Sequence, residues 1–315
     1  MSHATEVAEH VRNEMSKVIV GQRQVQDHLL LVALTGGHAL IEGVPGLAKT
    51  LAVKALAQIF QLQFQRVQCT PDLMPADVLG ANVFNLSNSS FSLRRGPIFT
   101  DLLLVDEINR TPPRTQSALL EAMEERQVTI DGTSHGLSGF FSVFATQNPV
   151  EFEGTYPLPE AQLDRFVMKI SIGYPKAEEE AQILKNMQEG FDPRELQNAG
   201  LVPLPADALQ KARVEVSAVR VEPKLFQYIV ALTARTRSWP AVSLGASPRA
   251  AISLMQVAKG VAAIEGRDFL IPDDIKFAAP AVLRHRLVLK PEADLEGMTA
   301  DQVVREVVAV VEVPK

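Results

Sequence analysis

The chain is poor in several residue types that would assign it to a particular class of protein. Its 315 residues include one cysteine, Cys69, which excludes an internal disulfide framework and any multi-cysteine zinc or iron–sulfur site. With 31 lysines and arginines against 37 acids, the net charge is −6, so the basic excess typical of nucleic-acid-binding proteins is missing. No apolar run approaches the roughly 18 residues of a membrane span, and the N-terminus has no secretory pattern. We expect a cytoplasmic protein.

The sequence also gives little support for a histidine metal site or for a nucleophilic serine. The six histidines include no pair at the i, i+4 spacing of a helical zinc site, so we expect no built-in metal site other than one for Mg²⁺. No G-x-S-x-G element is present that would expose a nucleophilic serine. The composition, 46% hydrophobic and 22% charged, is that of an ordinary globular protein with a substantial core.

The first part of the chain alternates short apolar runs with helical patterns. The runs are about as long as strands and lack a strict polar–apolar alternation, which predicts strands buried on both faces. Strands that alternate with helices predict an α/β fold with a parallel sheet. The predicted strands are 38–41, 102–105, 140–145 and 166–172, with 64–69 as a weaker candidate.

The second part of the chain, beyond about 173–200, has helical patterns almost throughout. Residues 177–187 open with three acids, which suit a helix N-terminus. Pro205, Pro223, Pro248 and Pro272 each precede a helix-like run, so we predict that they stand in first turns. The chain is therefore predicted to have two domains, an α/β core over 1–175 and an all-helical domain over 176–315.

Two stretches interrupt the alternation of strands and helices. Residues 77–98 have a turn-rich centre at 85–90 between apolar flanks. Residues 127–140 carry Asp131 and Gly132, a dipeptide typical of hairpin turns. Both stretches are predicted to be β-hairpins inserted into the core.

A candidate phosphate site lies at 43–50, in the sequence GVPGLAKT. It follows a predicted strand and opens a predicted helix, as a P-loop does, although Ala48 replaces the second glycine of the pattern. Backbone N–H groups there would face phosphates, the Lys49 amine would add positive charge, and the Thr50 hydroxyl would ligate Mg²⁺. A glycine-rich turn without a ligand is the alternative. The candidate binding residues are Gly43, Val44, Pro45, Gly46, Leu47, Ala48, Lys49, Thr50 and Leu51.

Polar residues also follow two of the predicted strands. Asp106 and Glu107 end the run 102–105, where Asp106 would hold Mg²⁺ and Glu107 would act as general base toward the attacking water. The same pair could simply cap the next helix. Asn148 would place that water near the γ-phosphate, but asparagine before proline is also a common turn residue.

Three arginines are further candidates for phosphate contacts. Arg165 would act as an arginine finger on the nucleotide of a neighbouring subunit, or it is a surface arginine paired with a nearby acid. Arg249 lies in the first turn of a predicted helix, where a cation is unfavourable unless an anion such as phosphate faces it. Arg110 would contact nucleotide across an interface, or neutralise Glu107 or a carboxylate of another subunit.

Together these residues resemble the AAA+ ATPases, in which they would form Walker A, Walker B, sensor 1, the arginine finger and sensor 2. In that superfamily, the segment 18–22 resembles the adenine-contacting stretch, so Ile19 and Val20 are further candidate binding residues. The hairpins would be the helix-2 insert and the pre-sensor-1 hairpin. Within the superfamily the chain is similar to the MoxR family, through 41–50, 70–77, 96–99, 106–110, 119–128, 145–149, 154–166 and 245–249.

The resemblance implies an AAA+ P-loop domain followed by a helical lid, with ATP and Mg²⁺ bound between the subunits of a ring, typically a hexamer. It further implies chaperone-like maturation, assembly or metal loading of a partner, usually a von Willebrand factor A-domain protein. A metal-chelatase motor subunit and a nucleotide-gated scaffold are alternatives. A nucleic-acid motor is another, although the weakly charged stretch 127–140 and the net charge argue against it.

Overall fold

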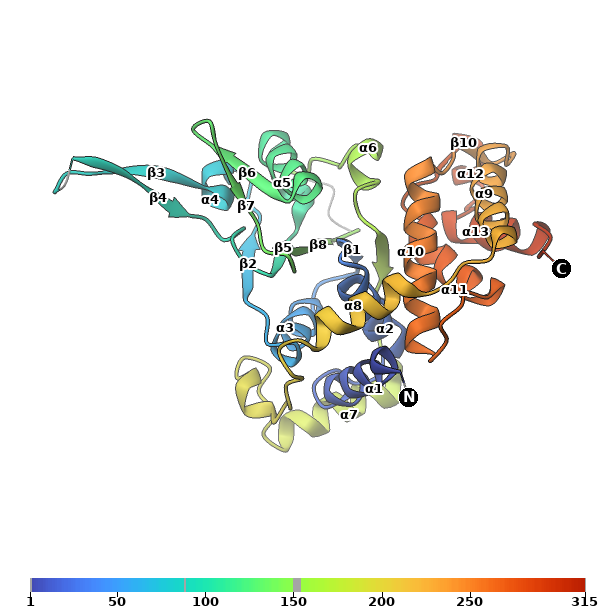
Figure 1. Cartoon of the computed structure of the whole chain (residues 1–315), viewed down its shortest axis with the longest axis horizontal. Coiled ribbons are helices and arrows are strands. Elements are labelled where there is room, and N and C mark those ends of the chain that lie inside the picture. The colour runs from blue at the N-terminus through green and yellow to red at the C-terminus, as the bar shows by residue number, and fades with distance from the viewer. Residues whose placement is uncertain (1, 88, 150–153, 315) are drawn as a thin grey trace.

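The computed structural model describes residues 2–87, 89–149 and 154–314, and a parallel sheet organises the first half of the chain. Each predicted strand of the core is present, including the weaker candidate, and every pairing within this sheet is parallel, as predicted. The strands lie in the order β2 (Phe64–Gln68), β5 (Leu102–Asp106), β8 (Ser142–Gln147), β1 (Ala39–Glu42) and β9 (Met168–Ser171) (Figure 1).

Both faces of this sheet are buried. On β5, Leu102 and Leu104 point into one hydrophobic core while Leu103 and Val105 point into a second, as the twofold period of a strand requires. The first core includes α1 (His3–Ser16), α2 (Arg23–Thr35) and α3 (Lys49–Ile59). The second includes α4 (Pro75–Leu79), the 3-10 turn η1 (Ile108–Arg110) and α5 (Pro113–Glu125). The continuous apolar runs of the sequence reflect this double burial.

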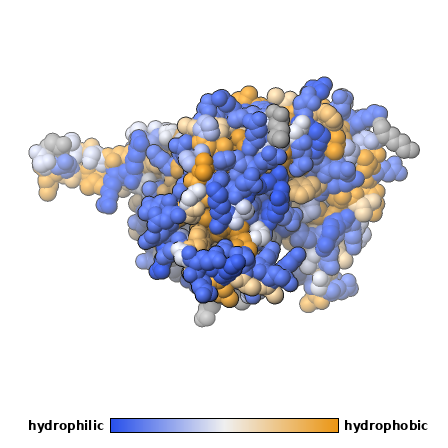
Figure 2. Space-filling model, turned by 90° about the horizontal axis from the view of Figure 1, so that it is seen from below, coloured by the Kyte–Doolittle hydropathy of each residue, from blue (hydrophilic) through white to orange (hydrophobic). Residues whose placement is uncertain are grey.

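The two predicted hairpins are confirmed. β3 (Gly80–Asn85) pairs with β4 (Ser90–Arg95) in an antiparallel arm that extends from the body of the molecule (Figures 1 and 2). Residue 88, in the predicted turn of this arm, lies outside the described residues. β6 (Gln127–Ile130) pairs with β7 (Thr133–Gly136). Asp131 and Gly132 join them with φ angles of 49° and 80°, the left-handed pair of a tight hairpin turn.

Beyond residue 175 the chain is mainly helical, as predicted, with one two-stranded ribbon in addition. Pro223, Pro248 and Pro272 each begin a helix, as predicted. A short helix of the core, α6 (Glu160–Leu163), precedes β9. The elements after β9 are α7 (Ala177–Gln188), η2 (Leu196–Ala199), α8 (Ala208–Ala218), α9 (Pro223–Arg237), β10 (Val242–Leu244), α10 (Pro248–Ile264), α11 (Pro272–Leu283), β11 (Val288–Leu289), α12 (Pro291–Leu295) and α13 (Ala300–Val310).

Three local expectations were wrong or incomplete. Pro205 is not in a first turn, because α8 begins three residues later, after Asp207 at its N-cap. The strand predicted at 140–145 starts at Ser142 and continues to Gln147, since pairing with β1 extends it beyond its apolar run. Helices α1 and α2 precede every element that the periodicity predicted. The domain boundary between 175 and 176 stays a prediction.

Among residues 2–87, 89–149 and 154–314, no helix combines the length and the apolar character that crossing a membrane requires.

Candidate functional site

The carboxyl ends of three adjacent strands meet at one edge of the sheet. There Asp106 ends β5, Asn148 follows β8, and the loop 43–48 follows β1. A cavity of about 770 Å³ opens beside this edge, with Asp106, Glu107 and Asn148 in its wall. That volume lies in the range of small-molecule and cofactor sites. The parallel register thus gathers residues that are about 40 to 100 positions apart in the sequence, as open α/β sheets do.

The loop 43–48 has a backbone that few residues tolerate. A Cβ atom on Gly43 would lie 2.8 Å from the carbonyl oxygen of Ile172, so a side chain there would push against the backbone just after β9. Gly46 has a φ angle of 86°, in the left-handed region that favours glycine. Ala48 also has a positive φ, 56°, although it carries a Cβ atom. The alanine therefore keeps the conformation expected of the glycine that it replaces.

Lys49 begins α3 and closes the loop. Its Nζ donates to the carbonyl of Gly43 at 2.6 Å. Burial lowers the pKa of Lys49, while the nearby carboxylates of Asp106, Glu107 and Glu42 act in the opposite direction. The first backbone bond at this end of the helix joins the Ala52 N–H to the Ala48 carbonyl, so the preceding N–H groups have no partner within the helix. This arrangement suits an anion such as phosphate.

Asp106 accepts hydrogen bonds at both of its carboxylate oxygens. The Thr146 hydroxyl of β8 donates to Oδ1 at 2.6 Å, and Nη2 of Arg66 on β2 lies 2.6 Å from Oδ2. Thr50, in the first turn of α3, lines the same cavity. A hydroxyl and a carboxylate are ligands that Mg²⁺ prefers, so these side chains fit the metal role predicted from the sequence.

Glu107 has an unusual backbone, with φ at 61°, just after the strand has ended. Its N–H donates to the Thr146 hydroxyl at 2.8 Å, which ties both acids to β8. Gln68 Nε2 donates to the Glu107 carboxylate at 3.2 Å, and Arg110 Nε lies 3.4 Å from it. Of the alternatives for Arg110, the structure therefore shows the contact with Glu107 of the same chain. A non-glycine residue in the left-handed region is typical of functional sites.

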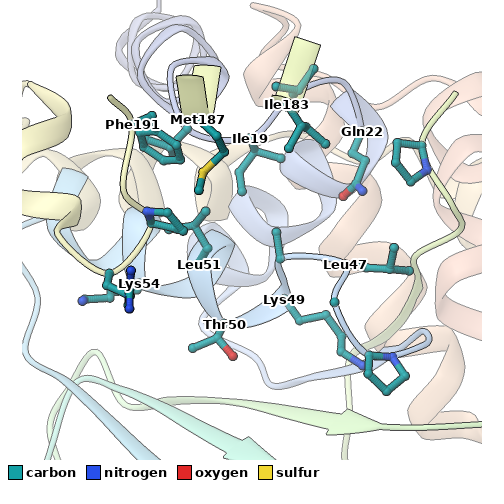
Figure 3. Close-up of a pocket in the computed structure, with 18 of the residues that line it drawn as sticks. Ile19, Gln22, Leu47, Lys49, Thr50, Leu51, Lys54, Ile183, Met187 and Phe191 are labelled. Atoms are coloured by element: carbon teal, nitrogen blue, oxygen red, sulfur yellow. The ribbon is translucent and has the colours of Figure 1, made fainter. Parts of the chain in front are cut away.

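The far side of the cavity is apolar. In Figure 3, Ile19, Leu51, Met187 and Phe191 gather on one side, and Lys49 and Thr50 lie on the other. Val20, from the segment 18–22, also lines the cavity. Such a division suits a ligand with a flat apolar part and an anionic part. Pro45, Gly46, Leu47 and Ala48 complete the wall near the phosphate loop, whereas Val44 packs on the hydrophobic core.

Helix α7 supplies lining residues that the sequence motifs did not identify. Ile183, Asn186 and Met187 face the cavity, followed by Phe191. Ile183 and Met187 are four residues apart and so share one helix face. That spacing was visible in the sequence, but nothing in it showed that the face turns toward the phosphate loop.

Arg165 and Arg249 lie together but away from this cavity. Arg165 Nε is 2.7 Å from one oxygen of Glu124, and Arg249 Nη2 is 2.5 Å from the other. The hydrogen bonds from Arg165 and Arg249 hold the pKa of Glu124 below its ordinary value. Among the described residues that line the cavity, neither arginine is present. The structure therefore brings the two predicted arginines to each other but not to the phosphate loop of their own chain.

The sequence of the chain matches those of known ATPases, which is consistent with a nucleotide site in this cavity. Residues 38–168 match the ATPase family associated with various cellular activities (AAA), and residues 234–307 match the AAA lid domain. The chain is 47% identical to YeaC, an uncharacterized protein of Bacillus subtilis, over 95% of this chain and 92% of YeaC. It is 41% identical to chaperone MoxR1 of Mycobacterium tuberculosis, over 96% of this chain and 81% of the relative.

One solved structure is also similar to this chain over nearly its whole length. The crystal structure of an ATPase candidate from Cytophaga hutchinsonii superposes on this chain with a TM-score of 0.87. The two sequences are 40% identical, and the match covers 98% of each chain.

Proposed function

Because this chain belongs to the MoxR family of AAA+ ATPases, we propose that it hydrolyses ATP at the subunit interfaces of a ring and uses the energy to remodel a partner protein. The AAA+ fold with its lid is present, and the cavity at the sheet edge is where ATP would bind. We propose that this activity takes place in the cytoplasm, where ATP is available.

In this proposal the loop 43–51 holds the phosphates and the apolar side of the cavity holds the base. The backbone N–H groups at the start of α3 and the Lys49 amine bind the β- and γ-phosphates. Ile19, Val20 and residues of α7 pack against the adenine. Thr50 and Asp106 would hold one Mg²⁺ ion, which supplies positive charge to the phosphate oxygens when it is bound.

Hydrolysis is assigned to the residues at the strand ends. Glu107 accepts a proton from the attacking water, and Asn148 orients that water. Gln68 and Arg110 fix the Glu107 carboxylate through the contacts at 3.2 and 3.4 Å. A preorganised base of this kind typically accelerates proton transfer about 10²- to 10⁴-fold.

The placement of Arg165 and Arg249 is the observation that carries the ring proposal. Both side chains are permanently charged and both form ion pairs with Glu124. Neither is among the described residues that line the cavity of the same chain. Arginines that complete an active site from a neighbouring chain are worth about 10³- to 10⁵-fold in phosphoryl transfer. We therefore propose that Arg165 and Arg249 act on the nucleotide of the next subunit in a homo-oligomeric ring, which we expect to be hexameric.

The partner is proposed from the family. The name of the relative chaperone MoxR1 supports a chaperone-like role, in which this chain would mature, assemble or load metal into a client. We propose a von Willebrand factor A-domain protein as the client, as is usual in the family. Pulling down the client with an ATP-trapped Glu107→Gln ring tests this part of the proposal.

Sedimentation velocity and phosphate release test the ring. We expect wild type and Glu107→Gln to form rings with Mg²⁺-ATP, and only wild type to release phosphate. Arg165→Ala and Lys49→Ala should each be inactive alone, and mixing them should restore part of the turnover because some interfaces then combine an intact cavity with intact arginines. Monomers under all conditions, or no recovery at any mixing ratio, would contradict the shared site.

A nucleic-acid motor is a second candidate because of the side chains on the arm β3–β4. Phe84 and Phe91 are 46% and 71% exposed, and Arg94 and Arg95 are exposed on the same arm. Exposed aromatic and basic groups are what single-stranded nucleic acids bind. Binding of a single-stranded oligonucleotide that weakens steeply with salt would favour this function.

A further inference from the structure

A buried ion pair joins the core to the helical domain close to Arg165 and Arg249. Nε of Arg286 lies 2.6 Å from Oδ1 of Asp164, and the Arg286 side chain is 1% exposed. Asp164 directly precedes Arg165, at the end of α6, while Arg286 follows α11. The pair therefore links the segment that carries Arg165 to the domain that carries Arg249.

The guanidinium of Arg286 contacts the core segment along several residues. Besides Asp164, it donates to the carbonyls of Phe166 at 2.8 Å and Val167 at 3.2 Å. It also donates to the Ser253 hydroxyl of α10 at 3.1 Å and to the Val282 carbonyl of α11. One planar group thus ties residues 164–167 to two helices of the helical domain. A lysine at this position could not reproduce this planar set of donors.

Asp164 also contacts the start of α10 directly. The Ser247 hydroxyl donates to its Oδ2 at 2.7 Å, and the same oxygen of Ser247 caps the helix by accepting from the Ala250 N–H. Arg249 is two residues beyond Ser247 in the first turn of α10. Since Asp164 directly precedes Arg165, this hydrogen bond joins the two segments whose arginines both reach Glu124.

Such a pair has a high desolvation cost. Burial lowers the pKa of the Arg286 guanidinium, and the hydrogen bond to Asp164 opposes that effect. Buried ion pairs often stabilise a fold no better than apolar side chains of the same size, so stability alone is a weak reason for one. What the pair does provide is a fixed geometry between the two elements that it joins.

We propose that Asp164 and Arg286 are positioning residues for ATP hydrolysis. They hold the helical domain at the orientation in which Arg165 and Arg249 reach a single phosphate of the neighbouring subunit together. Neither residue touches the nucleotide; each acts through the two arginines. This inference rests on the proposed function, since it takes the ring and its shared sites as given.

The test is Arg286→Lys in the full-length chain, which keeps the charge balance with Asp164 but loses the planar donor set. We expect phosphate release to fall tenfold to a hundredfold, because small misplacements of catalytic groups have effects of that size. Binding of Mg²⁺-ATP to the variant should stay within twofold of wild type, because its own cavity is unchanged. Arg267→Lys is the matched control, since Arg267 forms an equally short 2.6 Å pair with Asp274 beyond the other end of α10, and its turnover should stay unchanged.

Mixed rings separate a positioning role from a general loss of structure. Arg286→Lys mixed with Lys49→Ala should recover turnover, because the Arg286→Lys cavity then meets intact arginines. Recovery in the Arg165→Ala and Lys49→Ala mixture without recovery here would overturn the positioning role while leaving the ring intact. If neither mixture recovers, the proposed function itself fails.

A milder variant covers the case in which Arg286→Lys does not fold. Ser247→Ala removes the hydrogen bond to Asp164, together with the N-cap bond from the Ala250 N–H, and leaves the ion pair in place. The same loss of turnover, with the same recovery on mixing, would support the proposal. Unchanged turnover in a folded Ser247→Ala protein would overturn the role of Asp164 in holding the start of α10, and with it Arg249, beside Arg165.

Discussion

Arg66 and Asp106 form an ion pair across two neighbouring strands, with Nη2 of Arg66 2.6 Å and its Nε 3.2 Å from Oδ2 of Asp106. The parallel register pairs Asp106 with Gln68, so Arg66 reaches forward along β2 to the end of β5. The arginine therefore occupies an oxygen of the residue to which we assign Mg²⁺ binding.

Removal of Arg66 should allow Mg²⁺ to support ATP hydrolysis at lower concentrations. In Arg66→Gln, a cation no longer competes for Asp106, so the Mg²⁺ concentration for half-maximal phosphate release should fall. Partly exposed ion pairs contribute up to about 1 kcal/mol, which corresponds to a decrease of up to roughly fivefold. Arg94→Gln on the arm β3–β4 is the control and should leave the Mg²⁺ dependence as in wild type.

Glu107→Gln should separate binding from turnover. Glutamine has the same shape but cannot accept a proton, so phosphate release should fall about 10²- to 10⁴-fold while the affinity for a fluorescent ADP analogue is kept. Glu125→Gln, an exposed acid at the end of α5, should have neither effect. Full turnover in Glu107→Gln would show that another group is the base.

Because Ala48 has a left-handed backbone conformation, we expect that glycine at this position would make the protein more stable. Ala48→Gly removes a Cβ atom at a φ angle of 56° and should raise the free energy of unfolding by about 1 kcal/mol. In the interior of the same helix, Ala52→Gly should lower it by about 1 kcal/mol. Urea unfolding of the two variants measures the contrast, and equal destabilisation of both would contradict this reading of the loop.

The apolar face of α7 predicts a contribution to nucleotide affinity. Met187→Ala shortens a side chain in the cavity wall and should weaken ADP binding roughly five- to thirtyfold, as expected for about 1–2 kcal/mol of lost apolar contact. Leu184→Ala on the same helix is the control, because Leu184 is 71% exposed and is not among the described lining residues. Calorimetric titration with ADP compares them.

Stability should fall in acid because of buried neutral histidines. His38 accepts the Val143 N–H at Nδ1, so its proton is on Nε2, which faces the Met123 carbonyl at 3.1 Å. Burial lowers the pKa of His38 to about 4. Below pH 6.5 the unfolded chain binds a proton that the folded chain refuses, so stability is full above pH 6.5 and is lost as the pH falls through 4.

The size of this effect can be measured by urea unfolding at pH 7.5 and pH 5. The contribution of His38 to the difference should be about 2 kcal/mol. His38→Gln keeps a donor and an acceptor but does not titrate, so its stability should fall less between the two values. An identical decrease in the variant and in wild type would assign the acid sensitivity to other groups.

Local sequence determined the elements of the core and the phosphate loop. Strands buried on both faces have continuous apolar runs. The turn at Asp131 and Gly132 needs residues that adopt a positive φ angle. Prolines begin helices because their fixed φ angle suits the first turn. These signals depend on neighbouring residues, so they can be read without a structure. The resemblance of the motifs to AAA+ ATPases then identified the family.

Tertiary structure alone decided the contacts between distant segments. The face of α7 that lines the cavity, the pairing of Arg66 with Asp106, and the convergence of Arg165 and Arg249 on Glu124 each join residues with no shared local pattern. Arg286 is the clearest case, because it is buried against residues about 120 positions earlier in the chain. The packing of the helical domain on the core, which depends on the whole chain, placed it there.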